Sequence, residues 1–310
     1  TMLALCALVL VERGRLDVFA PVATYWPEFA ANGKGDIQVR HLLGHTSGVS
    51  GWDQPVTVED LYDWDRSTSM LAAQAPWWEP GSASGYHALN QGHLVGEVIR
   101  RVDGRRPGQF LAEEIAGPLG ADFHIGLDPS ADHRVAPVIP PEMAPVDLGP
   151  LGADHPAVKT FTGPTPQAEV AWTEGWKRAD IAAANGHGNA RSVALLQAVV
   201  ANRGRVGPVS LLSDETIGLI FREQARGVDL VLQEVQRFGI GYGLADPEVR
   251  PYLPEGRICY WGGWGGSQII VDCDRHLTIA YMMNRMMPGT GGDTRGEAII
   301  SATYAALGIA

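Results

Sequence analysis

Two short segments hold the groups best suited to chemistry. Tyr86 follows the Gly/Ser-rich loop at 81–85 and is expected in the first turn of a helix, where its phenol can be held at the mouth of a cleft. The segment "YWGGWGGS" at 260–267 places glycines directly before an apolar strand, so backbone N–H groups can approach a ligand without obstruction by side chains. A phenol can exchange a proton, and such N–H groups can bind a negatively charged oxygen. Taken alone, each segment also fits a structural role, as a packing tyrosine or a tight turn.

Other candidate sites carry a weaker signal. His41 and His45 in "HLLGH" are one helical turn apart, but no glutamate follows His41 and no third ligand is evident, so no metal site is expected. Asp60, Asp63 and Asp65 lie in the pattern of a surface helix, which favours a solvated face over a pair of catalytic carboxylates. The sequence contains no Gly-x-Ser-x-Gly elbow and no phosphate-binding loop, and no cofactor is expected.

Composition argues against several classes of partner. The 310 residues carry 24 basic and 35 acidic side chains, a net charge of -11, and no long run of lysine and arginine, so neither nucleic acid nor an anionic membrane surface is an expected partner. The apolar run that opens the chain is about half the roughly 20 residues that a membrane span needs. The three cysteines are odd in number and far apart, which predicts reduced thiols in the core and a cytoplasmic location.

Hydrophobic periodicity predicts helices over most of the first two thirds of the chain. Segment 1–14 has the pattern of a buried core helix that ends at Gly14. Further helices are expected before Gly104, over 107–115 and over 188–204. The proline-rich stretch 128–166 is expected to run over the surface.

The last third has the pattern of strands followed by a helix. Two apolar runs in "SQIIVDCDRHLTIAYMMNRM" at 267–286, joined by a turn, predict a β-hairpin that needs cover on both faces. The closing helix is expected to start with a capping box between Thr294 and Glu297. Its inward face is expected to hold Ile300, Tyr304 and Leu307.

These elements predict one α+β domain over residues 1–310, with an antiparallel sheet flanked by helices. A mostly helical region is expected over about 30–205. The sheet region is expected over about 206–310 and includes helix 1–14.

Three segments together resemble the serine β-lactamase and penicillin-binding-protein superfamily. They are "HLLGHTSGV" at 41–49, "PWWEPGSASGYH" at 76–87 and "YWGGWGGS", in this order and at these separations. Within the superfamily the chain is most similar to the class C-like branch that includes the family VIII carboxylesterases, and the likeness covers essentially the whole chain. The resemblance implies the β-lactamase/transpeptidase-like α+β fold, with N-terminal strands that this chain does not contain.

The superfamily acts through three elements, and the first is Ser-x-x-Lys. It stands at the start of the helix that segment 1–14 matches, so its lysine would fall immediately before Thr1. No Ser-x-x-Lys occurs anywhere in the sequence. We therefore expect a chain that is truncated just after its nucleophile and that is inactive as given.

The second element is a tyrosine motif that matches residues 86–88. The match implies that Tyr86 is the general base, although Ala88 stands where the family has asparagine. An unperturbed tyrosine, with a pKa of about 10, is a poor base at neutral pH, and the lysine ammonium of Ser-x-x-Lys would favour its phenolate. His87 and His187 are candidate borders of the site, with packing of a loop before a helix as the alternative for His187.

The third element is Lys-Thr-Gly in β-lactamases and often Trp-Gly-Gly in the esterases, and it matches Trp261, Gly262 and Gly263. The correspondence makes the backbone N–H of Trp264 one oxyanion donor. Trp261 cannot form the ion pair that lysine offers to a carboxylate, so the sequence favours small uncharged esters over β-lactams. The implied function is a serine hydrolase that forms an acyl-enzyme with such esters.

Alternatives stay open. β-Lactam or D-peptide hydrolysis shares the acyl-enzyme step and differs in the pocket. A catalytically inactive homologue that acts as a binding module belongs to a different class. We also expect the isolated chain to be poorly soluble, because loss of the leading strands would leave an unpaired sheet edge and an uncovered opening helix.

Overall fold

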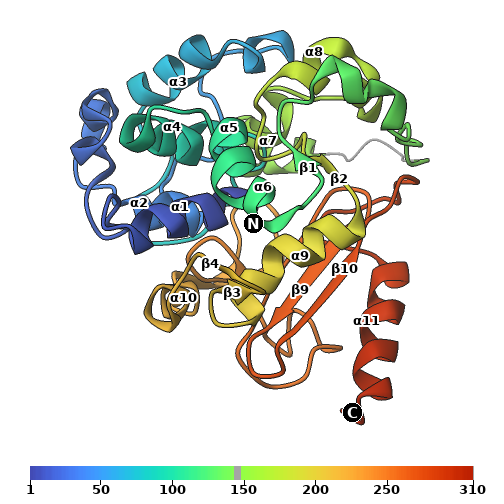
Figure 1. Cartoon of the computed structure of the whole chain (residues 1–310). Helices are drawn as coiled ribbons and strands as arrows, with labels where there is room; N and C mark the ends of the chain where they lie inside the picture. The colour runs from blue at the N-terminus through green and yellow to red at the C-terminus, as the bar shows by residue number, and fades with distance from the viewer. Residues whose placement is uncertain (143–147, 310) are drawn as a thin grey trace.

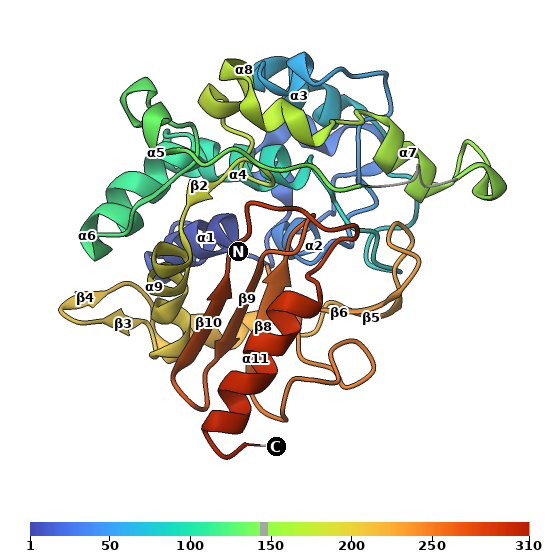
Figure 2. The ribbon, with the colours of Figure 1, turned by 90° about the vertical axis from the view of Figure 1, so that its right-hand side faces the viewer.

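A group of helices, here called the helical part and built around α1, α2, α3, α4 and α5, packs against an antiparallel sheet (Figure 1). The computed structural model describes residues 1–142 and 148–309. Helix α11 (Thr294–Ala306) lies in front of the sheet in Figure 2, and α9 (Ala190–Ala201) packs against strands β9 and β10. The predicted α+β class, with helices on both faces of an antiparallel sheet, is confirmed.

The central sheet has six antiparallel strands in the order β10-β9-β8-β7-β6-β5. The strands are β5 (Ala225–Val228), β6 (Val235–Phe238), β7 (Gly243–Leu244), β8 (Ile258–Gly262), β9 (Gln268–Asp272) and β10 (Leu277–Tyr281). The hairpin predicted over 267–286 is confirmed as β9 and β10, and its register pairs Ile270 with Ile279. Strand β8 pairs with β9 on its other side, which places Gly262 opposite Gln268.

The remaining α-helices lie between residues 2 and 220 of the chain. They are α1 (Met2–Glu12), α2 (Val39–Leu43), α3 (Trp64–Ala73), α4 (Gln91–Asp103), α5 (Pro107–Leu111), α6 (Gly117–Leu119), α7 (Pro156–Thr162), α8 (Glu174–Arg178) and α10 (Asp214–Ile220). Two short antiparallel pairs join β1 (Phe123–His124) to β2 (His187–Gly188) and β3 (Arg205–Val206) to β4 (Val209–Ser210). The division of the chain near residue 205 stays a prediction.

Helix α1 is covered on all sides. Residues 2–10 are each at most 8% exposed, because α4, α5 and α10 pack around the helix. The turn before β7 closes the remaining side, since Gly241 lies against Ala4. The expectation of an uncovered opening helix is therefore wrong, because the helical part supplies the cover.

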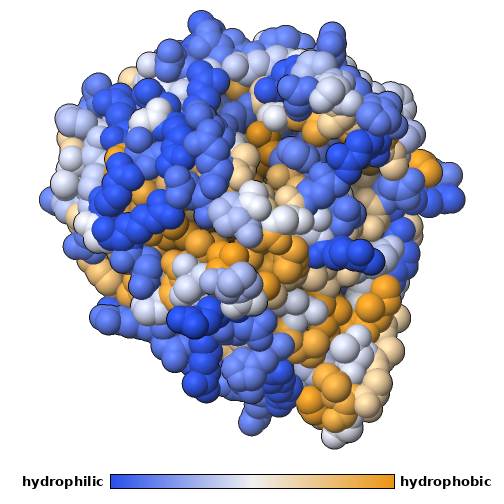
Figure 3. Space-filling view, in the orientation of Figure 1, coloured by the Kyte–Doolittle hydropathy of each residue, from blue (hydrophilic) through white to orange (hydrophobic). Residues whose placement is uncertain are grey.

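Apolar surface remains near the start of the chain. Figure 3 shows it gathered along the junction between the two parts of the molecule. Within the described residues β10 pairs with β9 alone, so the outer edge of β10 is open as expected. The low solubility that follows from an open strand edge stays a prediction.

Two helix ends differ from the sequence-based expectations. Asp293 caps α11 by accepting a hydrogen bond from the Arg295 N–H, in place of the capping box expected at Thr294. Ile300 and Tyr304 are buried as expected, whereas Leu307 is 55% exposed because it follows the last helical turn.

Helix α4 ends as expected and begins later than expected. Gly104 adopts the left-handed conformation that closes the helix. The first helical residue is Gln91, so the segment after the Gly/Ser loop is a further loop. The expected surface run 128–166 contains short helical turns and α7, and its residues 143–147 lie outside the described part.

The cytoplasmic location expected from the cysteines stays a prediction. Cys6, Cys259 and Cys273 are all buried free thiols, as expected. Among the described residues, none of the helices is both long and apolar enough for a membrane span.

We predict that Gly241→Ala lowers the free energy of unfolding by about 3 kcal/mol. Its new Cβ would lie 2.4 Å from Cβ of Ala4, on a backbone with φ +81°. Gly207→Ala is the matched control, because φ is +55° there but nothing lies within 4 Å of the Cβ position, so the loss should be about 1 kcal/mol. Denaturant unfolding of both variants measures the difference, and equal losses would contradict close packing of α1 on this turn.

Candidate active site

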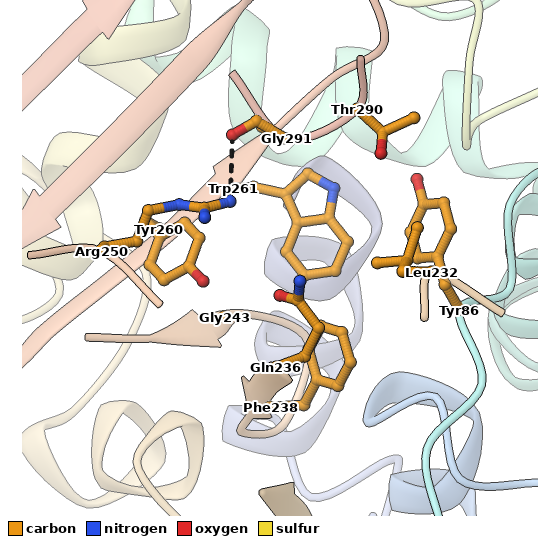
Figure 4. Close-up of a pocket in the computed structure, with 11 residues that line it drawn as sticks. Tyr86, Leu232, Gln236, Phe238, Gly243, Arg250, Tyr260, Trp261, Thr290 and Gly291 are labelled. Carbon is orange, nitrogen blue, oxygen red and sulfur yellow. Dashed lines mark hydrogen bonds between the residues drawn. The ribbon is translucent and has the colours of Figure 1, made fainter. Parts of the chain in front are cut away.

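The two chemistry-bearing segments of the sequence meet at one pocket between the helical part and the sheet (Figure 4). Tyr86 lies on one side and Trp261 in the centre of the view, with its indole facing the cavity. The lining residues are Tyr86, Leu232, Gln236, Phe238, Gly243, Arg250, Tyr260, Trp261, Gly262, Thr290 and Gly291. The predicted juxtaposition of Tyr86 with the Trp-Gly-Gly segment is therefore present.

Tyr86 lies in a loop five residues before α4, and the expectation of a first helical turn is wrong. Its main chain is tied to the connection between β5 and β6. The Tyr86 N–H donates to Oδ1 of Asp229 (3.0 Å), and the N–H of Leu230 donates to the carbonyl oxygen of Ser84 (2.8 Å). These tethers replace a helix as the means of aiming the half-buried phenol into the pocket (Figure 4).

The environment of Tyr86 favours the neutral phenol. Burial, together with the carboxylate of Asp229, raises the pKa of Tyr86 to about 12. Both effects disfavour a negative charge on the phenolate oxygen. As it stands in these 310 residues, Tyr86 is a hydrogen-bond donor at neutral pH and is not a strong base.

His45 is the centre of the aromatic packing behind the pocket. Its ring is stacked on Trp261 with centroids 5.3 Å apart and planes 15° apart. The rings of Tyr86 and Phe238 lie 5.3 Å and 4.9 Å from it. Burial lowers the pKa of His45 well below its usual value, so the ring is neutral, and its Nδ1 accepts a hydrogen bond from the N–H of His87 (3.0 Å).

His41 does not share a helix face with His45. Helix α2 ends at Leu43, and His45 follows in the left-handed conformation with φ 59°. Throughout the described ranges, the His, Cys, Asp and Glu side chains form no group of three that could hold a metal ion. His41 instead takes part in the N-terminal cap of α2, where its Nδ1 accepts from the N–H of Gln38 (3.2 Å).

His87 is buried behind the pocket and does not line it. Its Nδ1 lies 2.6 Å from the carbonyl oxygen of Gly85, and its Nε2 lies 2.6 Å from Oγ of Ser47. The carbonyl can only accept, so Nδ1 carries the proton and Nε2 accepts from the serine hydroxyl. This serine–histidine pair resembles a nucleophile and its base, but both side chains are fully buried and a substrate cannot reach them.

The loop after β8 holds the candidate oxyanion donor. Trp261 and Gly262 line the pocket, and the Gly263 N–H donates to the carbonyl oxygen of Ser267 (2.9 Å). Among the described residues the N–H of Trp264 has no acceptor, and neither Gly263 nor Trp264 is one of the residues that line the pocket. The part of Trp264 in binding an oxyanion stays a prediction. The Trp264 side chain is 39% exposed.

The segment from Gly291 to Arg295, which belongs to none of the three motifs, supports this loop. The backbone of Gly291 packs so closely on Gly262 that a Cβ there would lie 2.2 Å from the Gly291 carbonyl carbon. Arg295 donates to the carbonyl oxygens of Gly265 (3.1 Å) and Arg285 (2.9 Å). The start of α11 therefore fixes the loop that carries Trp264.

Polar pocket residues outside the motifs were also missed. Arg250 comes from the connection between β7 and β8, and Gln236 comes from β6. Neither stands in a motif or in a periodic pattern that could have marked it. His187, in contrast, was a candidate and does not line the pocket, since it lies in β2 opposite His124. Its role at the site stays a prediction.

Comparison with known proteins agrees with this geometry. The chain is 33% identical over 289 residues to "Esterase/beta-lactamase LipL" of Mycobacterium tuberculosis, a match that covers 90% of this chain and 66% of that protein. It is 26% identical to "Esterase EstB" of Burkholderia gladioli, covering 94% of this chain and 76% of that protein. The matched region thus spans about two thirds of the first relative's length.

Solved structures give the same result. A family VIII carboxylesterase is 39% identical with a TM-score of 0.91, covering 98% of this chain and 80% of that one. A penicillin-binding-protein homologue from Caulobacter crescentus is 37% identical with a TM-score of 0.88 and the same two coverages. The protein family described as Beta-lactamase matches residues 1–304. With its fold, its tyrosine loop and its Trp-Gly-Gly segment in place, the chain belongs to the Beta-lactamase family.

Proposed function

We propose that this chain carries the general base and the oxyanion-binding loop of a serine hydrolase that cleaves small carboxylic esters through an acyl-enzyme. The observation that carries the proposal is the position of Tyr86 and the Trp261 loop at one pocket (Figure 4). Relatives named as esterases and a structure named as a family VIII carboxylesterase support the ester as substrate class. The nucleophile requires a Ser-x-x-Lys sequence, which these 310 residues do not contain.

The proposed reaction has two halves. The serine hydroxyl attacks the ester carbonyl while the Tyr86 phenolate takes its proton, and the N–H of Trp264 binds the oxygen that becomes negative. The tetrahedral intermediate then expels the alcohol, which takes the proton from Tyr86. Water repeats the sequence on the acyl-enzyme and releases the acid, so the serine and the phenolate are restored.

A cation must act on Tyr86 for this reaction to run at neutral pH. Its pKa of about 12 leaves too little phenolate, and a lysine ammonium beside it would lower that value. In the family resemblance this lysine precedes the segment that forms α1. Both views place the start of α1 at the junction between the helical part and the sheet (Figures 1 and 2).

Trp261 favours uncharged ester chemistry next to the scissile bond. Its indole forms an apolar wall where β-lactamases of the family place a lysine. Relatives that carry the name "Putative D-alanyl-D-alanine carboxypeptidase", such as the one from Escherichia coli K12 at 23% identity, keep peptide hydrolysis as the alternative. A binding protein without catalysis is the alternative from another class.

The first prediction concerns the nucleophile. We expect the 310-residue chain to give no turnover of p-nitrophenyl butyrate and no labelling by a fluorophosphonate. A variant extended by a segment whose Ser-x-x-Lys ends directly before Thr1 should gain both. Peptide mapping identifies the labelled residue, and its Ser→Ala form is the control. Labelling of a serine within the unextended chain, such as Ser47 or Ser84, would contradict the proposal.

The second prediction concerns substrate and base. The extended chain should hydrolyse p-nitrophenyl butyrate faster than nitrocefin, because Trp261 offers no ion pair to a β-lactam carboxylate. Tyr86→Phe in the same chain should lower kcat by about 100-fold or more, since the general base is lost. Steady-state kinetics with both substrates provide the measurement. Faster turnover of nitrocefin would overturn the assignment to the esterase branch, and full activity of the Phe variant would remove Tyr86 from the mechanism.

The third prediction concerns the Tyr86 proton in the chain as given. With a pKa of about 12, Tyr86 should remain protonated at about pH 10, so the chain and its Tyr86→Phe variant should show equal phenolate absorbance there. Asp229→Asn removes the carboxylate charge and keeps an oxygen that can accept the Tyr86 N–H, so it should lower the pKa of Tyr86. An unchanged titration in this variant would mean that Asp229 has no electrostatic effect on the phenol.

A further inference from the structure

The peptide bond that precedes Tyr86 is held at both ends. Its N–H, on Tyr86, donates to Oδ1 of Asp229 (3.0 Å). Its carbonyl oxygen, on Gly85, lies 2.6 Å from Nδ1 of His87. Because the N–H and the carbonyl of a trans peptide point in opposite directions, the two contacts hold the same peptide plane from opposite sides. This plane sets the direction in which the Tyr86 side chain leaves the backbone, so Asp229 and His87 together aim the phenol.

The imidazole of His87 is held on its other side by a serine. Its Nε2 lies 2.6 Å from Oγ of Ser47, and the same oxygen accepts a hydrogen bond from the N–H of Val49 (3.1 Å). One lone pair of Oγ is used in this way, and the hydroxyl proton is available to Nε2. Both side chains are fully buried, so bulk water does not compete for either group.

Only one neutral form of His87 satisfies both contacts. Burial lowers its pKa to about 4, so near pH 7 the ring is neutral and carries a single proton. With that proton on Nδ1, the ring donates to the Gly85 carbonyl and accepts from the Ser47 hydroxyl. With the proton on Nε2, a lone pair of Nδ1 would face the carbonyl oxygen at 2.6 Å, which is repulsive. The serine hydroxyl therefore supports the tautomer that holds the Tyr86 peptide.

The same loop also holds the backbone on either side of the phenol. The Gly85 N–H donates to the carbonyl oxygen of His45 (2.9 Å), and the His87 N–H donates to Nδ1 of that residue (3.0 Å). His45 and Ser47 are two residues apart, in the segment that follows α2. One short segment of the chain thus fixes the tyrosine loop from behind, while the β5–β6 connection fixes it through Asp229.

We propose that His87 and Ser47 are positioning residues for the reaction of the proposed esterase: the serine hydroxyl selects the imidazole tautomer, and the imidazole N–H holds the Tyr86 phenol toward the pocket. This inference rests on the proposed function, because it names the residues that support its general base. Tyr86 lines the pocket and His87 does not, so the imidazole acts through the backbone and takes no proton from the substrate.

Two substitutions of similar shape separate the N–H donor from packing. Asparagine can place a side-chain N–H where His87 has Nδ1, whereas leucine fills a similar space and has no donor. In the chain as given, His87→Asn should keep the phenol of Tyr86 in place, with its pKa at about 12. His87→Leu should release the peptide, expose the phenol and bring that pKa toward about 10. Ultraviolet titration against the matching double variants with Tyr86→Phe measures this phenol alone.

His93→Leu is the matched control for loss of a buried imidazole. His93 is also fully buried, and its Nε2 lies 3.0 Å from the carbonyl oxygen of Leu61, in another part of the chain. Its loss should lower the melting temperature and leave the Tyr86 titration unaltered. A merely structural role for His87 would give the same result in both leucine variants.

Ser47→Ala tests the tautomer and replaces His87→Leu if that variant does not fold. It removes the hydroxyl that donates to Nε2, so Nδ1 no longer has to carry the proton. Nitrogen NMR of the imidazole should show the proton on Nδ1 in the unaltered chain and a mixture of both tautomers in the variant. The pKa of Tyr86 should fall in the same direction as in His87→Leu.

Kinetics of the chain extended by Ser-x-x-Lys give the second readout. His87→Leu should lower kcat by about tenfold or more with little change in KM, because the phenol is misplaced while the walls of the pocket stay. His87→Asn should retain most of kcat. Rates are counted per folded molecule, as judged by the melting curve, so that loss of folded protein is not read as loss of catalysis.

Either of two results would overturn the proposal: the asparagine and leucine variants titrate alike in the chain as given, or they have equal kcat in the extended chain. Its failure is separable from failure of the proposed function, because the titration needs no turnover. If the extended chain is inactive and the Tyr86 titration still depends on the donor at residue 87, the hydrolase is refuted and the serine–histidine support of the phenol stands.

Discussion

The site depends on the contact of His45 with Trp261, which joins the helical part to the sheet. The two rings are stacked 5.3 Å apart, and burial keeps the imidazole neutral. The same histidine holds the tyrosine loop, because its carbonyl oxygen accepts from the Gly85 N–H (2.9 Å) and its Nδ1 accepts from the His87 N–H. The left-handed turn at His45 therefore sets where the Tyr86 phenol stands relative to β8. A shift of either part would separate Tyr86 from the loop that carries Trp261.

A second tether to the sheet has an electrostatic consequence. Oδ1 of Asp229 accepts hydrogen bonds from the N–H groups of Tyr86, Val231 and Leu232, which orders the loop and the β5–β6 connection together. Its negative charge also opposes ionisation of the phenol. Rigid placement of Tyr86 and high basicity are thus in conflict within these 310 residues. An ammonium beside the phenol would resolve this conflict, and that is the role our proposal gives to the lysine of Ser-x-x-Lys.

The pocket combines an apolar wall with a group of donors. Trp261 and Phe238 exclude water near the phenol, while Arg250, Gln236 and Thr290 present polar atoms to the same cavity. The close packing of Gly291 on the β8 loop brings the two sets together, and the Asp293–Arg295 pair at the start of α11 fixes that segment. Such a pocket orients a ligand that has one apolar end and one polar end better than a uniformly apolar pocket does.

The sequence by itself determined the elements with strong local patterns. The hairpin at 267–286, the stop of α4 at Gly104 and the two chemistry-bearing segments were all predictable, because alternation, glycine caps and short motifs are local features. The start of α4 and the cap of α11 were not, since capping depends on one side chain and the backbone angle beside it.

Only the tertiary structure decided which polar groups face the pocket. Arg250 and Gly291 are far apart in the chain, and no periodic pattern in the sequence indicates that they are in contact. The burial of Ser47 and His87, which turns a reactive-looking pair into a structural one, is likewise a result of packing. Long-range contacts of this kind arise when distant segments exclude water from each other, and no local pattern records which segments will meet.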